Sequence, residues 1–201
     1  KFLVARRLMY WQVYLHKTSV AYENMLVSAL LRAKELASKG VELFASPALK
    51  FFLYNDINRE RFKSDPKCLE NFILLDDNDI WTALKVWCNH NDIILATLSQ
   101  GMVNREIFKV EVSPTPCTEE RLNAISERIA KQLHINKEDT RYFISTPSIE
   151  KNMYNPADDS IDILYNDGST TNIAEASDML HLSVLSKKVK KYYICYLREK
   201  K

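Results

Sequence analysis

The chain has 201 residues, of which 46% are hydrophobic, and its 28 Lys and Arg against 26 Asp and Glu leave a formal net charge of +2. This near-balance argues against a general affinity for nucleic acid or an anionic membrane surface. The composition is that of a globular protein rather than a disordered one, and no apolar run reaches the roughly 18 to 20 residues that a membrane-spanning helix requires. Four widely spaced cysteines without a CxxC pair indicate reduced thiols. We therefore expect a soluble, cytoplasmic protein.

Helical spacing of apolar residues dominates the first half of the chain. From Phe2 to about Lys39 apolar positions recur with a helical period, and Gly40 follows as a stop signal. Thr18 and Ser19 either cap a second helix or lie inside one long helix, and the pattern leaves both open. Further helices are expected over residues 49–54, 68–74, 80–87 and 93–100, the last ending at Gly101, with a polar surface loop over residues 59–66.

The hydrophobic period changes after residue 104. Strands are expected over residues 107–112, 142–146, 161–165, 171–173 and 192–197, with helices after Thr118 and Ser177 and tight-turn residues at 166–169. The predicted fold class is mainly α with a C-terminal α+β lobe. Two domains are predicted: a helical half over residues 1–104 and a small β-α-β-β-β-α-β lobe over residues 105–201.

Polar side chains interrupt the apolar spacing of the first helix. If that helix is continuous, Arg6, Tyr10, Tyr14 and Lys17 fall at i, i+4, i+8 and i+11, along one stripe. The planar fork of arginine suits phosphate oxygens, a tyrosine ring packs under a sugar, and lysine adds a point charge. Spacing alone also allows a simpler interpretation, in which the tyrosines are core aromatics and the two cations form a solvated edge.

The stretch from Ala5 to Thr18, ARRLMYWQVYLHKT, resembles the helix that follows the metal centre in HD-superfamily phosphohydrolases. The likeness is greatest to the dGTPase-like and SAM-and-HD-domain deoxynucleoside triphosphohydrolases. Residues 75–80 (LDDNDI) resemble the leucine-aspartate stretch before a helix in that family, and residues 103–110 (VNREIFKV) its arginine-x-x-x-lysine entry into the C-terminal lobe. The resemblance implies the helical half of an HD-domain fold and hydrolysis of a deoxynucleoside triphosphate to nucleoside and triphosphate.

The resemblance also implies roles for individual residues. Arg6 would face the terminal phosphates of the substrate and Tyr14 would lie under the deoxyribose. Tyr10, which stands where some members carry a histidine, would also contact the substrate. Lys17, Arg105 and Lys109 match residues that bind an effector nucleotide at a subunit interface in regulated members. The expected partners are therefore a deoxynucleoside triphosphate, a possible effector nucleotide and further copies of the chain in a dimer or tetramer.

The metal motif of that family is missing from the sequence. No His-Asp dipeptide occurs, and His16, His90, His134 and His181 are scattered singly. We therefore expect the chain to be a C-terminal piece of a longer protein, with the ligands of its divalent metal upstream of Lys1. No catalytic or metal-binding residue is expected here, and the chain alone is expected to be inactive. The aspartates at residues 76, 77 and 79 are interpreted as a helix cap.

Two other classes of function stay open. The basic positions could make the chain a non-catalytic regulatory module that binds nucleotide or nucleic acid, and an exposed helical face could make it an assembly domain that completes a dimer. The lysine-rich end, residues 187–201, with its interleaved tyrosines suits nucleic acid, although lysines also protect the edge of a sheet. A His…His-Asp…Asp pattern upstream would favour the enzyme.

Overall fold

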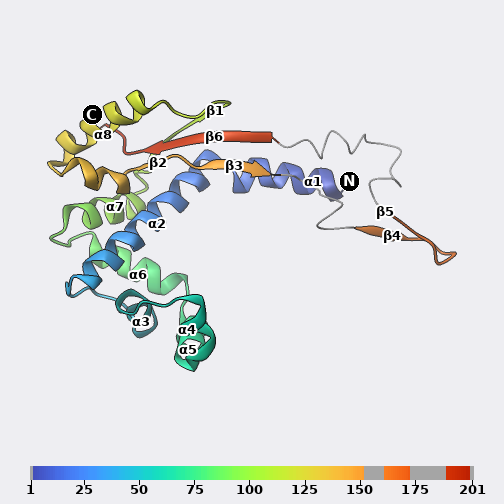
Figure 1. Cartoon of the computed structure of the whole chain (residues 1–201), viewed down its shortest axis with the longest axis horizontal. Helices are drawn as coiled ribbons and strands as arrows, with labels where there is room; N and C mark the ends of the chain where they lie inside the picture. Colours follow the sequence, from blue (N-terminus) through green and yellow to red (C-terminus); the bar gives the residue numbers. More distant parts are fainter. Residues whose placement is uncertain (1, 152–160, 173–188, 200–201) are drawn as a thin grey trace.

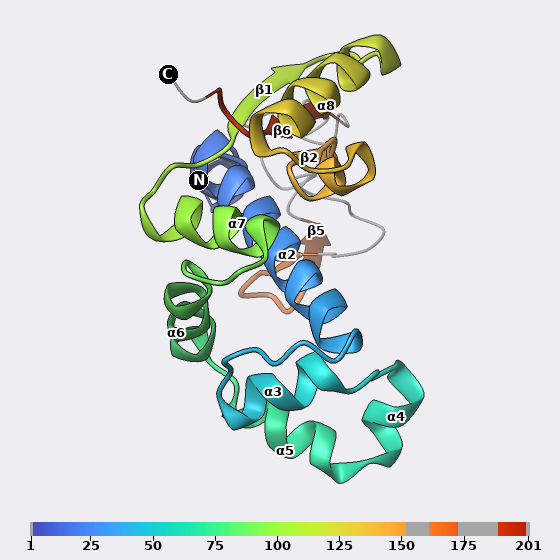
Figure 2. The ribbon, with the colours of Figure 1, turned by 90° about the vertical axis from the view of Figure 1, so that its left-hand side faces the viewer.

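The computed structural model describes residues 2–151, 161–172 and 189–199. They form a helical half and a smaller lobe built on a sheet, as the hydrophobic periods predict (Figure 1). The chain begins with α1 (Phe2–Met9), a π-helix, η1 (Tyr10–Tyr14), and the long helix α2 (Lys17–Ser38). Figure 2 shows α2 running from beneath the sheet down to the level of α3.

The first helical segment is broken at residues 15 and 16. His16 is the residue that caps α2, because its Nδ1 accepts a hydrogen bond from the backbone N–H of Thr18 at 3.2 Å. Ser19 instead donates from its hydroxyl to the carbonyl of Val13 at 2.9 Å, across the break. The sequence left open one long helix or two helices, and the structure has two. Thr18 and Ser19 both lie inside α2, so neither is its cap.

The helices between α2 and the sheet are α3 (Pro47–Tyr54), α4 (Arg59–Ser64), α5 (Pro66–Leu74), α6 (Asp77–Trp87) and α7 (Ile93–Val103). Asp76 and Asp79 form a capping box at the start of α6, which confirms the interpretation of this acidic stretch as a cap. The prediction of a surface loop over residues 59–66 was wrong, because residues 59–64 form α4. Asn58 accepts a hydrogen bond from the backbone N–H of Arg61 at 2.8 Å and thereby begins α4.

Gly101 lies inside α7 rather than after it, contrary to the prediction. A Cβ atom at this position would lie 2.8 Å from Cε of Met25 and 3.2 Å from the carbonyl oxygen of Glu106. The glycine therefore allows α7 to pack closely against α2. The helix ends at Val103, and Arg105 just beyond it adopts a positive φ of 61°.

The lobe contains β1 (Lys109–Ser113), α8 (Glu119–Leu133), a 3-10 helix, η2 (Lys137–Tyr142), β2 (Ile144–Ser145), β3 (Ser148–Lys151), β4 (Asp162–Leu164), β5 (Thr170–Asn172) and β6 (Val189–Tyr196). β6 pairs antiparallel with β1 on one side and with β2 and β3 on the other. β4 and β5 form a separate antiparallel hairpin, whose turn places Gly168 at a φ of 83° as the tight-turn residues predict.

Three details of the lobe differ from the sequence prediction. Phe108 is buried in the core, and the first strand begins after it, at Lys109. β3 was not predicted. Tyr142, expected in a strand, ends η2, and β2 begins at Ile144. Lys190 and Lys191 pair with β3, whereas β1 pairs with β6 over residues 192–196, so the interpretation of these lysines as protection of a sheet edge stays a prediction. The helix expected after Ser177 lies outside the described residues.

One hydrophobic core joins the helical half to the lobe. Met25 and Ala29 of α2 share a single buried cluster with Phe108, Ile129 and Phe143. The domain boundary between residues 104 and 105 stays a prediction, since buried side chains from both sides of it meet in this cluster. All four cysteines are free thiols, as expected. No helix in the described part of the chain combines the length and apolarity needed to cross a membrane.

Candidate functional site

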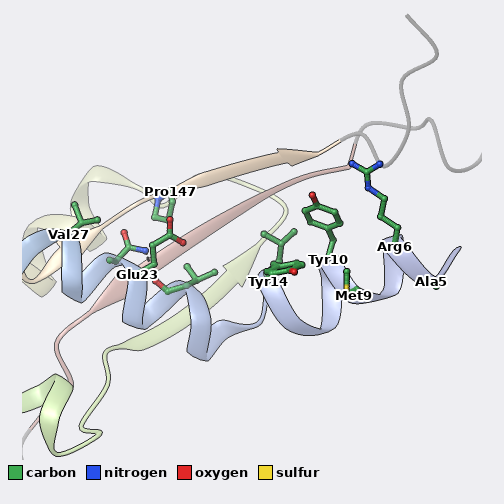
Figure 3. Close-up of a pocket in the computed structure, with 11 residues that line it drawn as sticks. Ala5, Arg6, Met9, Tyr10, Tyr14, Glu23, Val27 and Pro147 are labelled. Atoms are coloured by element: carbon green, nitrogen blue, oxygen red, sulfur yellow. Dashed lines mark hydrogen bonds between the residues drawn. The ribbon is translucent and has the colours of Figure 1, made fainter. Parts of the chain in front are cut away.

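The three residues expected to contact a substrate line one cavity. It has a volume of about 850 Å³ and lies beside α1, η1 and the first turns of α2. Arg6, Tyr10 and Tyr14 come from the N-terminal side, and Glu23 from α2. Pro147, in the connection between β2 and β3, lies on the opposite wall (Figure 3). The lobe therefore contributes to the same cavity as the first helices.

The π-helix places the two tyrosines. The backbone N–H of Leu15 donates to the carbonyl of Tyr10 at 2.8 Å, a five-residue step that widens this turn. The ring centroids of Tyr10 and Tyr14 are 5.3 Å apart with an interplanar angle of 52°, and Cζ of Arg6 lies 5.9 Å from the Tyr10 centroid. Three of the four residues of the predicted stripe therefore follow one another along the cavity, whereas Lys17 lies beyond the break in the helix and does not line it.

The exposure of the three side chains bears on their role. Tyr14 is 54% exposed, so the interpretation of this tyrosine as a core aromatic is wrong. Arg6 and Tyr10 are half-buried. A guanidinium held against an aromatic ring can still offer its N–H donors to phosphate oxygens, while the ring faces offer an apolar wall to a sugar or base. This combination suits a ligand with a charged end and a flatter, less polar body.

Glu23, Asn24 and Pro147 also line the cavity and were not found by sequence reasoning. Asn24 donates to the carbonyl of Val20 at 2.7 Å, so part of its hydrogen-bonding capacity is already used. The break at residues 15 and 16 interrupts the helical periodicity between Tyr14 and Glu23, so spacing along one helix does not place Glu23 beside the tyrosines. Pro147 belongs to a segment that is distant in sequence. No local pattern connects these residues with the first helix.

Arg105 lies apart from the cavity of Arg6. It lines a second cavity of about 720 Å³ together with Met25 and Phe108. Lys17, the first residue of α2, is exposed.

Lys109 lines a third cavity, of about 500 Å³, and its Nζ lies 3.0 Å from Oε1 of Glu111. The second and third cavities share Arg198 and Glu199. The structure thus places Arg105 and Lys109 in neighbouring cavities, and the effector role of Lys17, Arg105 and Lys109 stays a prediction.

The acidic residues near His90 serve structural roles. The carboxylate of Asp92 accepts from the backbone N–H of Leu95 at 2.8 Å and from Arg32, and His90 Nδ1 accepts from the backbone N–H of Asp92 at 3.0 Å. Burial raises the pKa of Asp92, but the hydrogen bonds from Arg32 and Leu95 outweigh it and hold that pKa below its usual range. Within the described residues no group of three or more His, Cys, Asp or Glu side chains is placed to hold a metal ion.

No family model matches the chain. A solved structure of a phosphohydrolase from Bacteroides thetaiotaomicron VPI-5482 is 72% identical and superposes with a TM-score of 0.91, covering 98% of this chain and 49% of that one. An uncharacterised protein of Bacillus subtilis (strain 168), YwfO, is 29% identical over 114 residues, which are 56% of this chain and 24% of the relative. The chain is therefore similar over almost its whole length to a phosphohydrolase of which it spans about half. This similarity supports the phosphohydrolase prediction.

Proposed function

We propose that the chain is the C-terminal part of a metal-dependent HD-superfamily phosphohydrolase that resembles the deoxynucleoside triphosphate triphosphohydrolases. In this proposal it supplies contacts to phosphate and sugar and a surface for assembly, and it is inactive alone. The observation that carries the proposal is the cavity in which Arg6, Tyr10 and Tyr14 lie in sequence along one wall. The likeness to a phosphohydrolase at 72% identity supports the reaction class.

Each of the three side chains has a distinct part. Arg6 binds the terminal phosphates, where a planar guanidinium can form two parallel hydrogen bonds. Tyr10 holds that guanidinium against its ring and so limits its orientations. Tyr14 presents its exposed ring face to the deoxyribose. The ligand would therefore lie along α1 and η1, with its phosphates at Arg6 and its sugar at Tyr14.

The described residues do not fit the divalent metal that the proposal requires, since they hold no suitable cluster of ligands. The proposal therefore assigns the metal ligands to chain upstream of Lys1 and assigns this chain no metal-binding or catalytic residue. Its partners are a deoxynucleoside triphosphate, further copies of the chain and a possible effector nucleotide at Lys17, Arg105 and Lys109.

The first test compares the 201-residue chain with a longer protein that adds the proposed metal-binding half. Release of inorganic triphosphate from deoxynucleoside triphosphates is measured with and without a metal chelator. We expect chelator-sensitive release from the longer protein and none from the chain alone. Chelator-sensitive release from the purified chain would contradict the proposed division of labour. Nucleotide binding without hydrolysis by the longer protein would favour the non-catalytic module.

The second test replaces the phosphate-binding residue in the longer protein. Loss of a charge-assisted hydrogen bond weakens an interaction by roughly 1.5 to 3 kcal/mol, so Arg6→Ala should lower triphosphate turnover by about 10- to 100-fold. Binding of the bare deoxynucleoside should change much less. Arg59→Ala, an exposed arginine on α4, is the matched control and should leave both quantities unchanged. Equal losses of triphosphate turnover and deoxynucleoside binding in Arg6→Ala would contradict the phosphate role.

A further inference from the structure

The outer face of α5 exposes a row of large apolar side chains. Leu69, Phe72 and Ile73 fall at i, i+3 and i+4, so they lie side by side on one face of the helix, and they are called here the α5 stripe. They are 51%, 57% and 72% exposed. Among the residues of α5 only Cys68 is buried, so most of the apolar surface of this helix faces outward.

Local contacts fix the helix that carries the α5 stripe. Asp65 caps α5 by accepting a hydrogen bond from the backbone N–H of Lys67 at 3.1 Å, and Pro66 lies in the first turn. The ring of Phe72 packs edge-on against the ring of Phe62 on α4, with the two centroids 5.8 Å apart. The α5 stripe is therefore part of an ordered surface.

Exposed cations precede the α5 stripe. Lys63 lies near the end of α4 and Lys67 in the first turn of α5, and both side chains are exposed. The ion pair at this turn joins Arg61 to Asp65, with 3.7 Å between Nε and Oδ2. Neither lysine therefore has an ionic partner among the described residues. Because side chains on a helix lean towards its N-terminus, Lys67 extends over the start of α5.

Exposed carboxylates follow the α5 stripe. Asp76 and Asp77 come directly after the end of α5, and both are exposed. The capping box of α6 uses the side chains of Asp76 and Asp79. The carboxylate of Asp77 has no ionic partner within the part of the chain that the structure describes. The α5 stripe therefore has positive charge at one end and negative charge at the other.

The location of α5 favours a second copy of the chain as the partner. The helix α1, through which any upstream chain would connect, lies beneath the sheet, whereas α4 and α5 lie beyond the other end of α2 (Figures 1 and 2). An upstream half has apolar surface closer to its connection, since Leu8 and Val13 are 51% and 54% exposed. It is therefore not needed to cover α5.

We propose that two copies of the chain associate through the α5 stripe, with the two α5 helices antiparallel about a two-fold axis. In such an interface the same surface of each copy packs against itself, which removes both stripes from water. The antiparallel orientation also brings the basic end of one stripe to the acidic end of the other. Lys67 and Asp77 are equally far in sequence from Phe72, so a pairing centred on Phe72 places them opposite each other.

The proposal deepens the proposed function, because it names the surface through which the expected copies of the chain meet. It rests on that function only for the expectation of copies, and assembly is measured without hydrolysis. Sedimentation velocity of the 201-residue chain over a range of concentrations should show a monomer–dimer equilibrium. We expect a dissociation constant in the micromolar range, since one short helix from each copy buries less than the roughly 800 Å² per partner of a standard interface. A chain that stays monomeric at every concentration would overturn the proposal.

One apolar-to-charged substitution tests the α5 stripe itself. Ile73→Asp places a carboxylate in the apolar contact twice, once from each copy, and should weaken dimerisation about 100-fold. The side chain of Ile73 is 72% exposed, so the fold should tolerate the change. Leu31→Asp, at a position on α2 that is 58% exposed, is the matched control and should dimerise like its parent. Equal dimerisation of the Ile73→Asp variant and its parent would overturn the proposal.

A charge exchange tests the antiparallel orientation. Lys67→Glu and Asp77→Lys should each weaken dimerisation several-fold, because each places like charges opposite one another in the two copies. The two changes together in one chain reverse the pair and should restore most of the affinity. A purely structural role for either residue gives no such recovery. Two losses that simply add would overturn the proposal.

The same variants in the longer protein separate a second copy from the upstream half. Dimers that Ile73→Asp dissociates support the proposal, whether or not the protein hydrolyses nucleotides. A monomeric longer protein whose melting temperature falls in Ile73→Asp but not in Leu31→Asp would show that the upstream half covers the α5 stripe, and would overturn the proposal. Absence of hydrolysis in an intact dimer would contradict the proposed function alone.

Discussion

The two helical stretches on either side of His16 have similar spacing of apolar residues, but only the second contributes one face to the core, its other face exposing Val27 and Leu31. In the first stretch, Leu8, Val13 and Tyr14 are between 51% and 54% exposed. In the second stretch, Met25 and Ala29 are at most 1% exposed. Periodicity therefore predicts that both are helices but does not say which one supports the core. The exposed stretch carries the proposed ligand contacts, and the buried stretch holds the two halves together.

The buried stretch also holds an ion-pair network. Arg32 of α2 forms a two-point contact with Asp92, with Nε donating at 3.1 Å and Nη2 at 2.6 Å. Glu35, one turn later, lies 3.3 Å from Arg32 and accepts a hydrogen bond from the Tyr142 hydroxyl. These contacts join α2 to the start of α7 and to η2. Substitutions in the two stretches should therefore have very different effects on stability.

The largest effect is expected for Arg32→Met. The Arg32 side chain is only 11% exposed, and its loss leaves the carboxylate of Asp92 without its ionic partner. Breaking a buried pair in this way costs about 3 kcal/mol of unfolding free energy. Urea denaturation measures the change, and Arg59→Met on the exposed surface of α4 is the control, with an expected change within about 0.5 kcal/mol. A similar change in the two variants would show that the network contributes little.

A smaller effect is expected from pH. Hydrogen bonds from Lys39 and Tyr142 lower the pKa of Glu35 from 4.5 to about 2. Because the folded-state pKa is the lower one, the stabilisation is present above pH 4.5 and is lost as the pH falls towards 2. Asp92, whose pKa is also lowered, acts in the same direction. Urea titrations across this range should show a steeper loss of stability for the parent than for Glu35→Gln. Parallel curves would contradict the prediction.

The smallest effect on stability is expected in the exposed stretch. Tyr14→Ala should change the unfolding free energy of the 201-residue chain by no more than about 0.5 kcal/mol, since surface substitutions rarely do more. In the longer protein the same change should raise KM and reduce discrimination between deoxy- and ribonucleotides. A loss above about 1 kcal/mol would mean that Tyr14 supports the fold. Deoxy- and ribonucleotide rates that fall in proportion would remove its role at the sugar.

Features set by neighbouring residues were accessible from the sequence. The capping pattern of Asp76 and Asp79 predicts the start of α6, and Gly168 predicts the turn between β4 and β5. Asn58 is a comparable N-cap, and it is the local sequence signal that indicates the start of α4. The π-helix over Tyr10–Tyr14 differs from an α-helix by one hydrogen-bond step, for which the local residues give no signal.

Features set by distant residues were not accessible. In the sequence Gly101 resembles a helix stop, but in the structure it lies inside α7 and leaves space for the side chain of Met25, which is distant in sequence. The pattern of the first helix predicts that Arg6 and the two tyrosines lie together, but Pro147 lines their cavity only because the lobe packs beside this helix. Arg105 and Lys109 are close in sequence, yet the turn into β1 directs them to different cavities.

The central position of β6 has a consequence for the synthesis of the protein. β1, β2 and β3 leave the ribosome before the strand that they all pair with, and Val20 of α2 packs against Tyr193 and Cys195 of that late strand. Such non-local pairing is slow, and unpaired strands invite aggregation. The helical half can therefore become ordered while translation continues, whereas the sheet of the lobe cannot form until β6 has been synthesised. Nonsense mutations that end the chain before Val189 should accordingly yield aggregating products even though most of the helices are encoded.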